Sequence, residues 1–180
     1  KKPNAHNFKF LLIDEENKQI FVRPGKWNIN QSLIIPKGYK VIAKEGTQLN
    51  LSNFAKILSY SSFEFLGMEE KPIIINSPDS TGQGVIVMNA NRASLLENVV
   101  FENLSAPSQS GWELTGAVTF YESPVSIYNC SFIGNRAEDA LNIVRSEFTI
   151  DKSLFTQAYS DAFDADFAKG SIKNCFFINS

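Results

Sequence analysis

The eight residues "VSIYNCSF" (Val125–Phe132) recur twice further along the chain in slightly altered form. "FTIDKSLF" covers 148–155 and "GSIKNCFF" covers 170–177, so the copies follow one another at steps of 23 and 22 residues. Each copy has Ile at its third position and Phe at its eighth. A fixed period of roughly 20–50 residues is typical of repeat architectures, in which each repeat forms one structural unit.

An earlier copy, "SLLENVVF" (94–101), carries Leu96, Asn98 and Phe101 at the matching positions, 31 residues before their counterparts. The additional residues lie between Phe101 and Val118. We therefore expect one loop to be lengthened while the scaffold on both sides keeps its register, which is how repeat proteins accept insertions.

Each repeat contains three short segments with β-type alternation and no helical stripe, such as "ALNIV", "FTID" and "SLFTQ". Gly, Asn, Ser and Asp separate the segments. Three strands per coil of about 22 residues predict an all-β fold, a parallel β-helix. A leucine-rich repeat is the alternative, because its period of about 20–29 residues overlaps. Its pattern needs an apolar residue three before the Asn and another two after it. Here Ile127 lies two before Asn129 and Phe132 three after it.

In a β-helix, equivalent residues of successive coils lie about 4.8 Å apart and form ladders. We predict an amide ladder, interrupted by Lys152, at Asn98, Asn129 and Asn174. We also predict a buried aromatic column at Phe101, Phe132, Phe155 and Phe177. Cys130 and Cys175 lie two coils apart, about 9.6 Å by rung spacing, so we expect no disulfide between them.

The chain divides into two expected parts. Residues 1–50 are irregular and are interpreted as an N-terminal cap running into the first coils, because the end of a solenoid needs covering. Residues 51–180 are interpreted as β-helix coils that continue beyond the C-terminus in a longer protein. An open C-terminal edge is expected to allow association with a partner.

The pattern "xIxNCxFxxN" at 126–135, together with the Asp-Ala-apolar sequences at Asp139 and Asp161, resembles the right-handed parallel β-helix proteins of the pectate-lyase-like superfamily. The resemblance extends from about residue 57 to residue 180. It implies a right-handed β-helix, a polysaccharide ligand bound on the outward face of one sheet, and an extracellular or cell-surface location. The catalytic motifs of polygalacturonases and the Arg-rich, calcium-binding set of pectate lyases are missing, so only the fold is carried over.

The second Asp-Ala sequence begins the segment that contains the candidate catalytic residues. Phe163 and Ala165 alternate with Asp164 and Asp166, so both carboxylates are predicted to face outward. Carboxylates at i and i+2 of a strand lie about 6.6 Å apart, near the separation of an inverting glycosidase pair. We predict catalytic roles for Asp161, Asp164 and Asp166. We predict substrate binding by Trp112, Tyr121, Asn142 and Arg145.

The same residues also have structural interpretations. Asp139 and Asp161 hold a turn by accepting backbone N–H groups, the acid pair keeps an outward face soluble, and Arg145 screens Asp166. Trp112 then clamps its own loop. The functional hypothesis is a domain that binds or cleaves an extracellular polysaccharide as a hydrolase or lyase. The alternative is a non-catalytic surface, adhesion or structural module.

The composition and net charge of the chain argue against several classes of binding partner. The net charge is −2, with no basic patch for nucleic acid, and apolar runs such as "FLLI" are too short to span a membrane. We expect a polysaccharide partner, with no nucleic acid and no membrane span. Metal-ligand spacing is missing and His6 is the only histidine. Neither a metal, a cofactor nor a histidine relay is expected.

Overall fold

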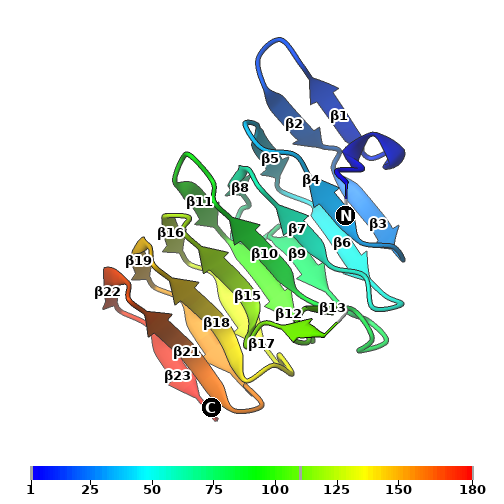
Figure 1. Cartoon of the computed structure of the whole chain (residues 1–180). Helices are drawn as coiled ribbons and strands as arrows, with labels where there is room; N and C mark the ends of the chain where they lie inside the picture. Colours follow the sequence, from blue (N-terminus) through cyan, green and yellow to red (C-terminus); the bar gives the residue numbers. More distant parts are fainter. Residues whose placement is uncertain (1, 110, 180) are drawn as a thin grey trace.

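The computed structural model describes residues 2–109 and 111–179, with Trp112 described by its backbone alone. The chain is an all-β parallel solenoid of about seven turns, with about 23 residues between equivalent positions. Figure 1 shows the coils stacked in sequence order from one end of the molecule to the other. The predicted β-helix with three strands per coil is therefore confirmed.

Three long sheets form the sides of the solenoid. The first sheet contains β1 (Leu11–Asp14), β2 (Gln19–Val22), β5 (Lys40–Lys44), β8 (Ser62–Leu66), β11 (Ser94–Glu97), β16 (Val125–Tyr128), β19 (Glu147–Asp151) and β22 (Lys169–Lys173). The second sheet contains β3 (Gly25–Ile29), β6 (Thr47–Leu51), β9 (Ile73–Asn76), β12 (Val99–Glu102), β17 (Ser131–Ile133), β20 (Leu154–Thr156) and β23 (Phe176–Ile178). The third sheet contains β4 (Leu33–Ile35), β7 (Ile57–Ser59), β10 (Val85–Met88), β15 (Gly116–Tyr121), β18 (Asp139–Val144) and β21 (Asp161–Asp166).

Two antiparallel pairings depart from this scheme. The strand β1 pairs with β2, and together with the 3-10 turn η1 (Ala5–Asn7) it precedes the first coil. Near this end Phe10 packs against Phe8 and Trp27, with ring centroids 5.5 and 5.6 Å apart. The second pairing is the hairpin of β13 (Ser108–Gln109) and β14 (Trp112–Glu113), which occupies the lengthened loop.

Residues with positive φ stand at the corners where the chain leaves each sheet. The corner after the first sheet holds Asn98, Asn129, Lys152 and Asn174, at φ between 49° and 52°. Left-handed backbone costs an ordinary L-residue about 1–2 kcal/mol, and Asn tolerates it best because its short amide bonds locally. The repeated Asn is therefore explained by the corner it occupies.

The amide ladder is confirmed in part. Asn129 Nδ2 donates to Asn98 Oδ1 at 2.6 Å, and Asn98 Nδ2 donates to the Gly67 carbonyl at 3.0 Å. Lys152 interrupts the ladder as predicted. Beyond it, Asn174 Nδ2 donates instead to Asp151 Oδ1 at 2.9 Å.

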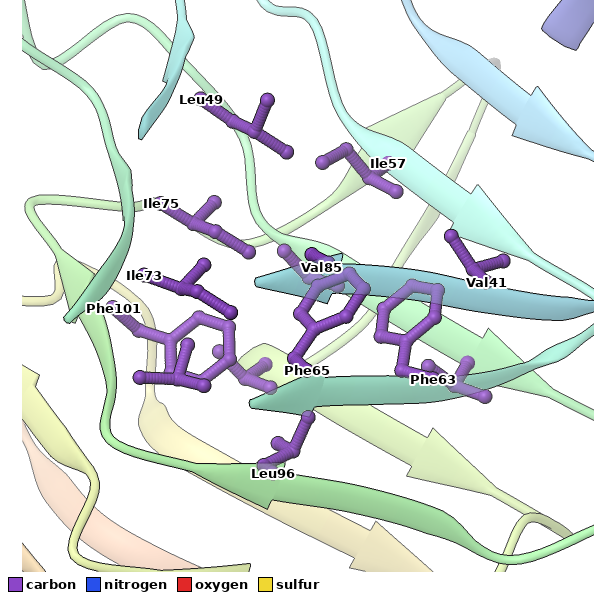
Figure 2. Packing of buried hydrophobic residues seen from close by; sticks show 14 of the residues in the cluster. Val41, Leu49, Ile57, Phe63, Phe65, Ile73, Ile75, Val85, Leu96 and Phe101 are labelled. Atoms are coloured by element: carbon purple, nitrogen blue, oxygen red, sulfur yellow. The ribbon is translucent and has the colours of Figure 1, made fainter. Parts of the chain in front are cut away.

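The stacking of the aromatic column is confirmed, but its last ring, Phe177, is 46% exposed rather than buried. The rings of Phe101, Phe132, Phe155 and Phe177 stack with successive centroid distances of 5.2, 4.7 and 4.8 Å. Figure 2 shows the upstream continuation of this core, where Phe101 lies beside Ile73 and Ile75. Phe132 and Phe155 are fully buried.

The stacked rings provide a first prediction. Phe132→Ala should lower the free energy of unfolding by about 3–5 kcal/mol, because the cavity lies between two rings that cannot move together. Denaturant titration followed by circular dichroism measures this change. Phe176→Ala, at a side chain that is 67% exposed, should change stability far less. Equal losses in both variants would contradict the column as the main source of core stability.

The interrupted ladder provides a second prediction. Lys152→Asn should raise the free energy of unfolding by about 1 kcal/mol, because Asn accepts the left-handed corner more readily than Lys. The exposed bond from Lys152 Nζ to the Tyr128 hydroxyl is lost, which is a small cost in water. Lys26→Asn, on the exposed part of β3, is the control and should not stabilise. The midpoint of thermal unfolding should be measured for the wild-type chain and both variants. A lower midpoint for Lys152→Asn would contradict the proposed preference for Asn at this left-handed corner.

Candidate functional site

The third sheet brings the predicted site residues into the expected register. Asn142 pairs with Thr119 on one side and with Asp164 on the other. Val144 pairs in the same way with Tyr121 and Asp166. These positions form a row of two columns along the sheet, one through Thr119, Asn142 and Asp164 and the other through Tyr121, Val144 and Asp166.

Exposure of that row differs from the expectation. Asn142 is only 3% exposed and Thr119 is also buried, so neither lies on an open face. Asn142 Nδ2 donates to Thr115 Oγ1 and to Asp139 Oδ2, each at 2.9 Å, and lies 3.5 Å from Asp164 Oδ2. Asn142 therefore does not lie on an open surface, and its amide ties Thr115 of the lengthened loop to the sheet. Its contact with a ligand stays a prediction.

That loop is fastened to the solenoid by buried polar groups. Lys56 Nζ donates to the Ser108 carbonyl at 2.9 Å and to Gln83 Oε1. Gln83 Nε2 donates in turn to Ser108 Oγ at 2.9 Å. Trp112 lies in this hairpin, but its side chain is outside the described residues, so its predicted contact with a ligand stays a prediction.

The acidic residues of β21 remain accessible. Asp161 and Asp166 are exposed and Asp164 is half-buried. Asp164 Oδ1 accepts the backbone N–H of Ala165 at 2.8 Å, which orients the carboxylate. Asp139, by contrast, is buried and accepts the Asn142 amide rather than a turn N–H.

Arg145 is held by Tyr121, the last residue of β15, and by Glu122, which follows it. Its Nη1 donates to the Tyr121 hydroxyl at 3.1 Å and lies 3.6 Å from Glu122 Oε1. The only bond to Asp166 is from the Arg145 backbone N–H to the Asp166 carbonyl. The expectation that Arg145 screens the Asp166 carboxylate is therefore not met. Instead the guanidinium carbon lies 6.0 Å from the centroid of Phe167, a ring that is 89% exposed.

A groove adjoins the acidic row at the corner between the third and first sheets. One hollow is lined at this corner by Glu122, Arg145 and Phe167, and a second lies over β16, β19 and β22. The two hollows share Pro124, Glu147 and Lys169, so they form one continuous depression. Three hydroxyl residues line the part over the first sheet, namely Ser126, Thr149 and Ser171.

Sequence reasoning missed this groove although its signal is present. Ser126, Thr149 and Ser171 occupy the second position of the three aligned repeats, where a hydroxyl recurs at steps of 23 and 22 residues. Thr149 Oγ1 donates to Ser126 Oγ at 3.1 Å. The prediction concerned the acidic residues of β21 in the third sheet, whereas the hollow lies mainly over the first sheet.

Within residues 2–109 and 111–179, no cluster of three or more His, Cys, Asp or Glu side chains is arranged to hold a metal ion. No helix in the same part of the chain is long and apolar enough to cross a membrane. Comparison with known proteins found no matching family model, no matching curated protein and no matching solved structure.

Both cysteines are free, as predicted. Burial raises the pKa of the Cys130 thiol to about 12, so the thiol stays protonated and unreactive at pH 8. A Cys175→Ser chain should consequently show almost no reaction with an aromatic disulfide reagent when folded at pH 8, and one thiol per chain in denaturant. Rapid full titration of the folded protein would show that Cys130 is not enclosed by the coils.

Proposed function

We propose that this chain is a carbohydrate-binding β-helix domain that holds a neutral polysaccharide along the acidic row of β21 and around the corner into the adjoining groove. The observation that carries the proposal is the continuity of these two features. Asp166 ends β21, Phe167 follows it at the corner, and Lys169 begins β22 in the wall of the groove.

The polar groups suit sugar hydroxyls. Carboxylates accept hydrogen bonds from hydroxyl groups, and bonds to charged groups contribute about 1.5–3 kcal/mol each. Asp161, Asp164 and Asp166 supply such acceptors on β21. Three carboxylates on one strand also repel a polyanion, which favours a neutral chain over a polyuronate.

The aromatic groups suit the apolar face of a sugar ring. Phe167 exposes nearly its whole ring at the corner, and Tyr121 lies two turns of the solenoid away from Asp166 in the same register column. Arg145 lies between them and bonds to Tyr121. An extended glycan that crosses this corner therefore has ring surfaces and charged donors within reach.

Resemblance to the pectate-lyase-like superfamily supports the location of the surface and an extracellular or cell-surface setting. It also supports a catalytic version of the proposal, a hydrolase in which Asp164 and Asp166 form the acid and base pair. Their separation along the strand, about 6.6 Å by backbone rise, suits an inverting mechanism. A lyase version would need a uronate chain instead, because β-elimination removes a proton made acidic by an adjacent carboxyl group. The competing hypothesis is a structural or adhesion module whose acids only keep the face soluble.

The double variant Asp164→Asn/Asp166→Asn tests the proposal. Its affinity for the best ligand in a panel of neutral polysaccharides should fall at least about tenfold, because two charge-assisted hydrogen bonds are weakened. Affinity electrophoresis measures this loss, with polygalacturonate as the charged comparison. The wild-type chain and the variant should be compared at a concentration where both have the same oligomeric state.

Glu69→Gln/Glu70→Gln is the matched control, since it removes two exposed carboxylates far along the chain from the site. It should bind like the wild-type chain. Retained affinity in the Asp164/Asp166 variant, or no binding to any polysaccharide, would favour the structural module. Release of reducing ends without unsaturated sugars by the wild-type chain, lost in Asp164→Asn, would establish the hydrolase version. Release of unsaturated sugars from polygalacturonate would establish the lyase version and reject the neutral substrate.

A further inference from the structure

A small hollow lies at the corner between the third and first sheets, in the coils that precede the lengthened loop. Its volume is about 100 Å³. None of its lining residues belongs to the candidate site. The residues that decide its chemistry are Tyr39, Tyr60, Ser61, Ser62, Asn91 and Arg92.

The hollow arises because a short corner lies between two longer ones. Only Tyr60 and Ser61 separate β7 from β8, whereas residues 36–39 separate β4 from β5 and residues 89–93 separate β10 from β11. These strands are neighbours in their sheets, so the three corners belong to successive coils about 4.8 Å apart. The longer corners form the walls of the hollow and the short corner forms its floor.

The volume of the hollow decides what it can hold. A water molecule occupies about 30 Å³ of the liquid, so the hollow has room for about three. A carboxylate or sulfate group fits this space, whereas sites for whole small molecules measure about 300–1,000 Å³. The hollow therefore suits the head group of a ligand whose remainder lies outside.

Ser62 contributes a buried polar group to the hollow. It is only 3% exposed, although it lies on the outward side of β8, since its neighbour Phe63 faces the core. Ser61 Oγ donates to the Pro36 carbonyl at 2.6 Å, but Ser62 Oγ makes no hydrogen bond within the described residues. A buried hydroxyl without a partner is unfavourable, so a ligand that bonds to Ser62 relieves this cost.

Arg92 contributes a positive charge that no acid of the described chain neutralises. The other cations close to the hollow are paired. Lys40 Nζ lies 2.7 Å from Glu64 Oε2, and Lys18 Nζ lies 3.1 Å from Glu15 Oε2. None of the ion pairs and hydrogen bonds of the described residues involves the Arg92 guanidinium. An anion therefore meets an uncompensated cation at this hollow.

The two tyrosines have different roles in the hollow. The Tyr39 hydroxyl donates to Glu15, and Lys18 Nζ lies 5.1 Å from the centroid of the Tyr39 ring. Tyr39 therefore serves as a fixed wall. The Tyr60 hydroxyl has no partner within the described residues, so it can donate a hydrogen bond to a ligand.

We infer that this hollow is a binding site for a single oxyanion, a carboxylate or a sulfate ester carried by a larger ligand. Arg92 pairs with two of its oxygens, since a guanidinium and an oxyanion match in a bidentate geometry. Ser62 and Tyr60 donate their hydroxyl groups, and Asn91 donates its side-chain amide. The inference does not depend on the proposed function, because the two sites share no residue.

Nuclear magnetic resonance titration of the isotope-labelled chain tests the inference. Sodium glucuronate, sodium glucose-6-sulfate and glucose are added separately at constant ionic strength. The amide signals of residues 60–62 and 91–92 should shift saturably with a dissociation constant of about 1 mM, because so small a group makes few contacts. Glucose should not shift them. A response to glucuronate alone identifies a carboxylate ligand, and a response to glucose-6-sulfate alone identifies a sulfate ester.

Two variants test the named groups. Arg92→Gln should raise the dissociation constant at least about tenfold, because the charge-assisted bidentate pair is lost. Ser62→Ala should raise it about threefold to tenfold, because one hydrogen bond is lost. Without ligand, Ser62→Ala should leave the midpoint of thermal unfolding unchanged or higher, since its hydroxyl bonds to nothing in the described chain.

Arg136→Gln is the matched control. It makes the same charge change at an exposed arginine between β17 and β18, and it should bind glucuronate like the wild-type chain. Asp164→Asn/Asp166→Asn should also keep this affinity, whatever happens to its polysaccharide binding. Failure of the oxyanion site and failure of the proposed function are therefore distinguishable.

Several results would overturn the inference. One is the lack of a saturable shift with either oxyanion at tens of millimolar, and another is an equal shift with glucose. An affinity that Arg92→Gln leaves unchanged, or that Arg136→Gln lowers equally, would show that the arginine of the hollow does not hold the anion. A lower unfolding midpoint for Ser62→Ala would show that its hydroxyl already has a partner in the folded chain.

Discussion

The backbone hydrogen bonds of this protein run along the solenoid axis, and this single constraint sets most of what the structure contains. Parallel pairing in register places each residue about 4.8 Å above its counterpart one coil earlier. A residue type that suits a position in one coil therefore also suits the equivalent position in the next coil. Phenylalanine stacks on phenylalanine in the column through Phe132 and Phe155, and an amide bonds to an amide at Asn98 and Asn129. Residues of opposite charge also occupy paired positions where the repeat changes, as at Glu147 and Lys169.

The corners are the second consequence of the same constraint. To stay in register, each coil must turn at the same places, and the turns after the three sheets use residues with positive φ. Where the residue is Asn the turn is met with little strain. Where it is another residue, as at Lys152 or Gln157, the chain accepts strained backbone. Three such residues, Glu122, Arg145 and Phe167, line the groove at the corner, so part of the strained backbone coincides with the candidate binding surface.

The period explains which predictions from sequence succeeded. The positions of Ile150, Phe155 and Asp164 follow from their spacing alone, because a repeat fixes both the strand and the face of the sheet. The burial of Asn142 did not follow, because it depends on where the lengthened loop folds back, and that loop belongs to no repeat. The partners of Arg145 were likewise missed. Its side chain reaches Tyr121 and Glu122 one coil earlier, whereas the sequence suggested the neighbouring coil that carries Asp166.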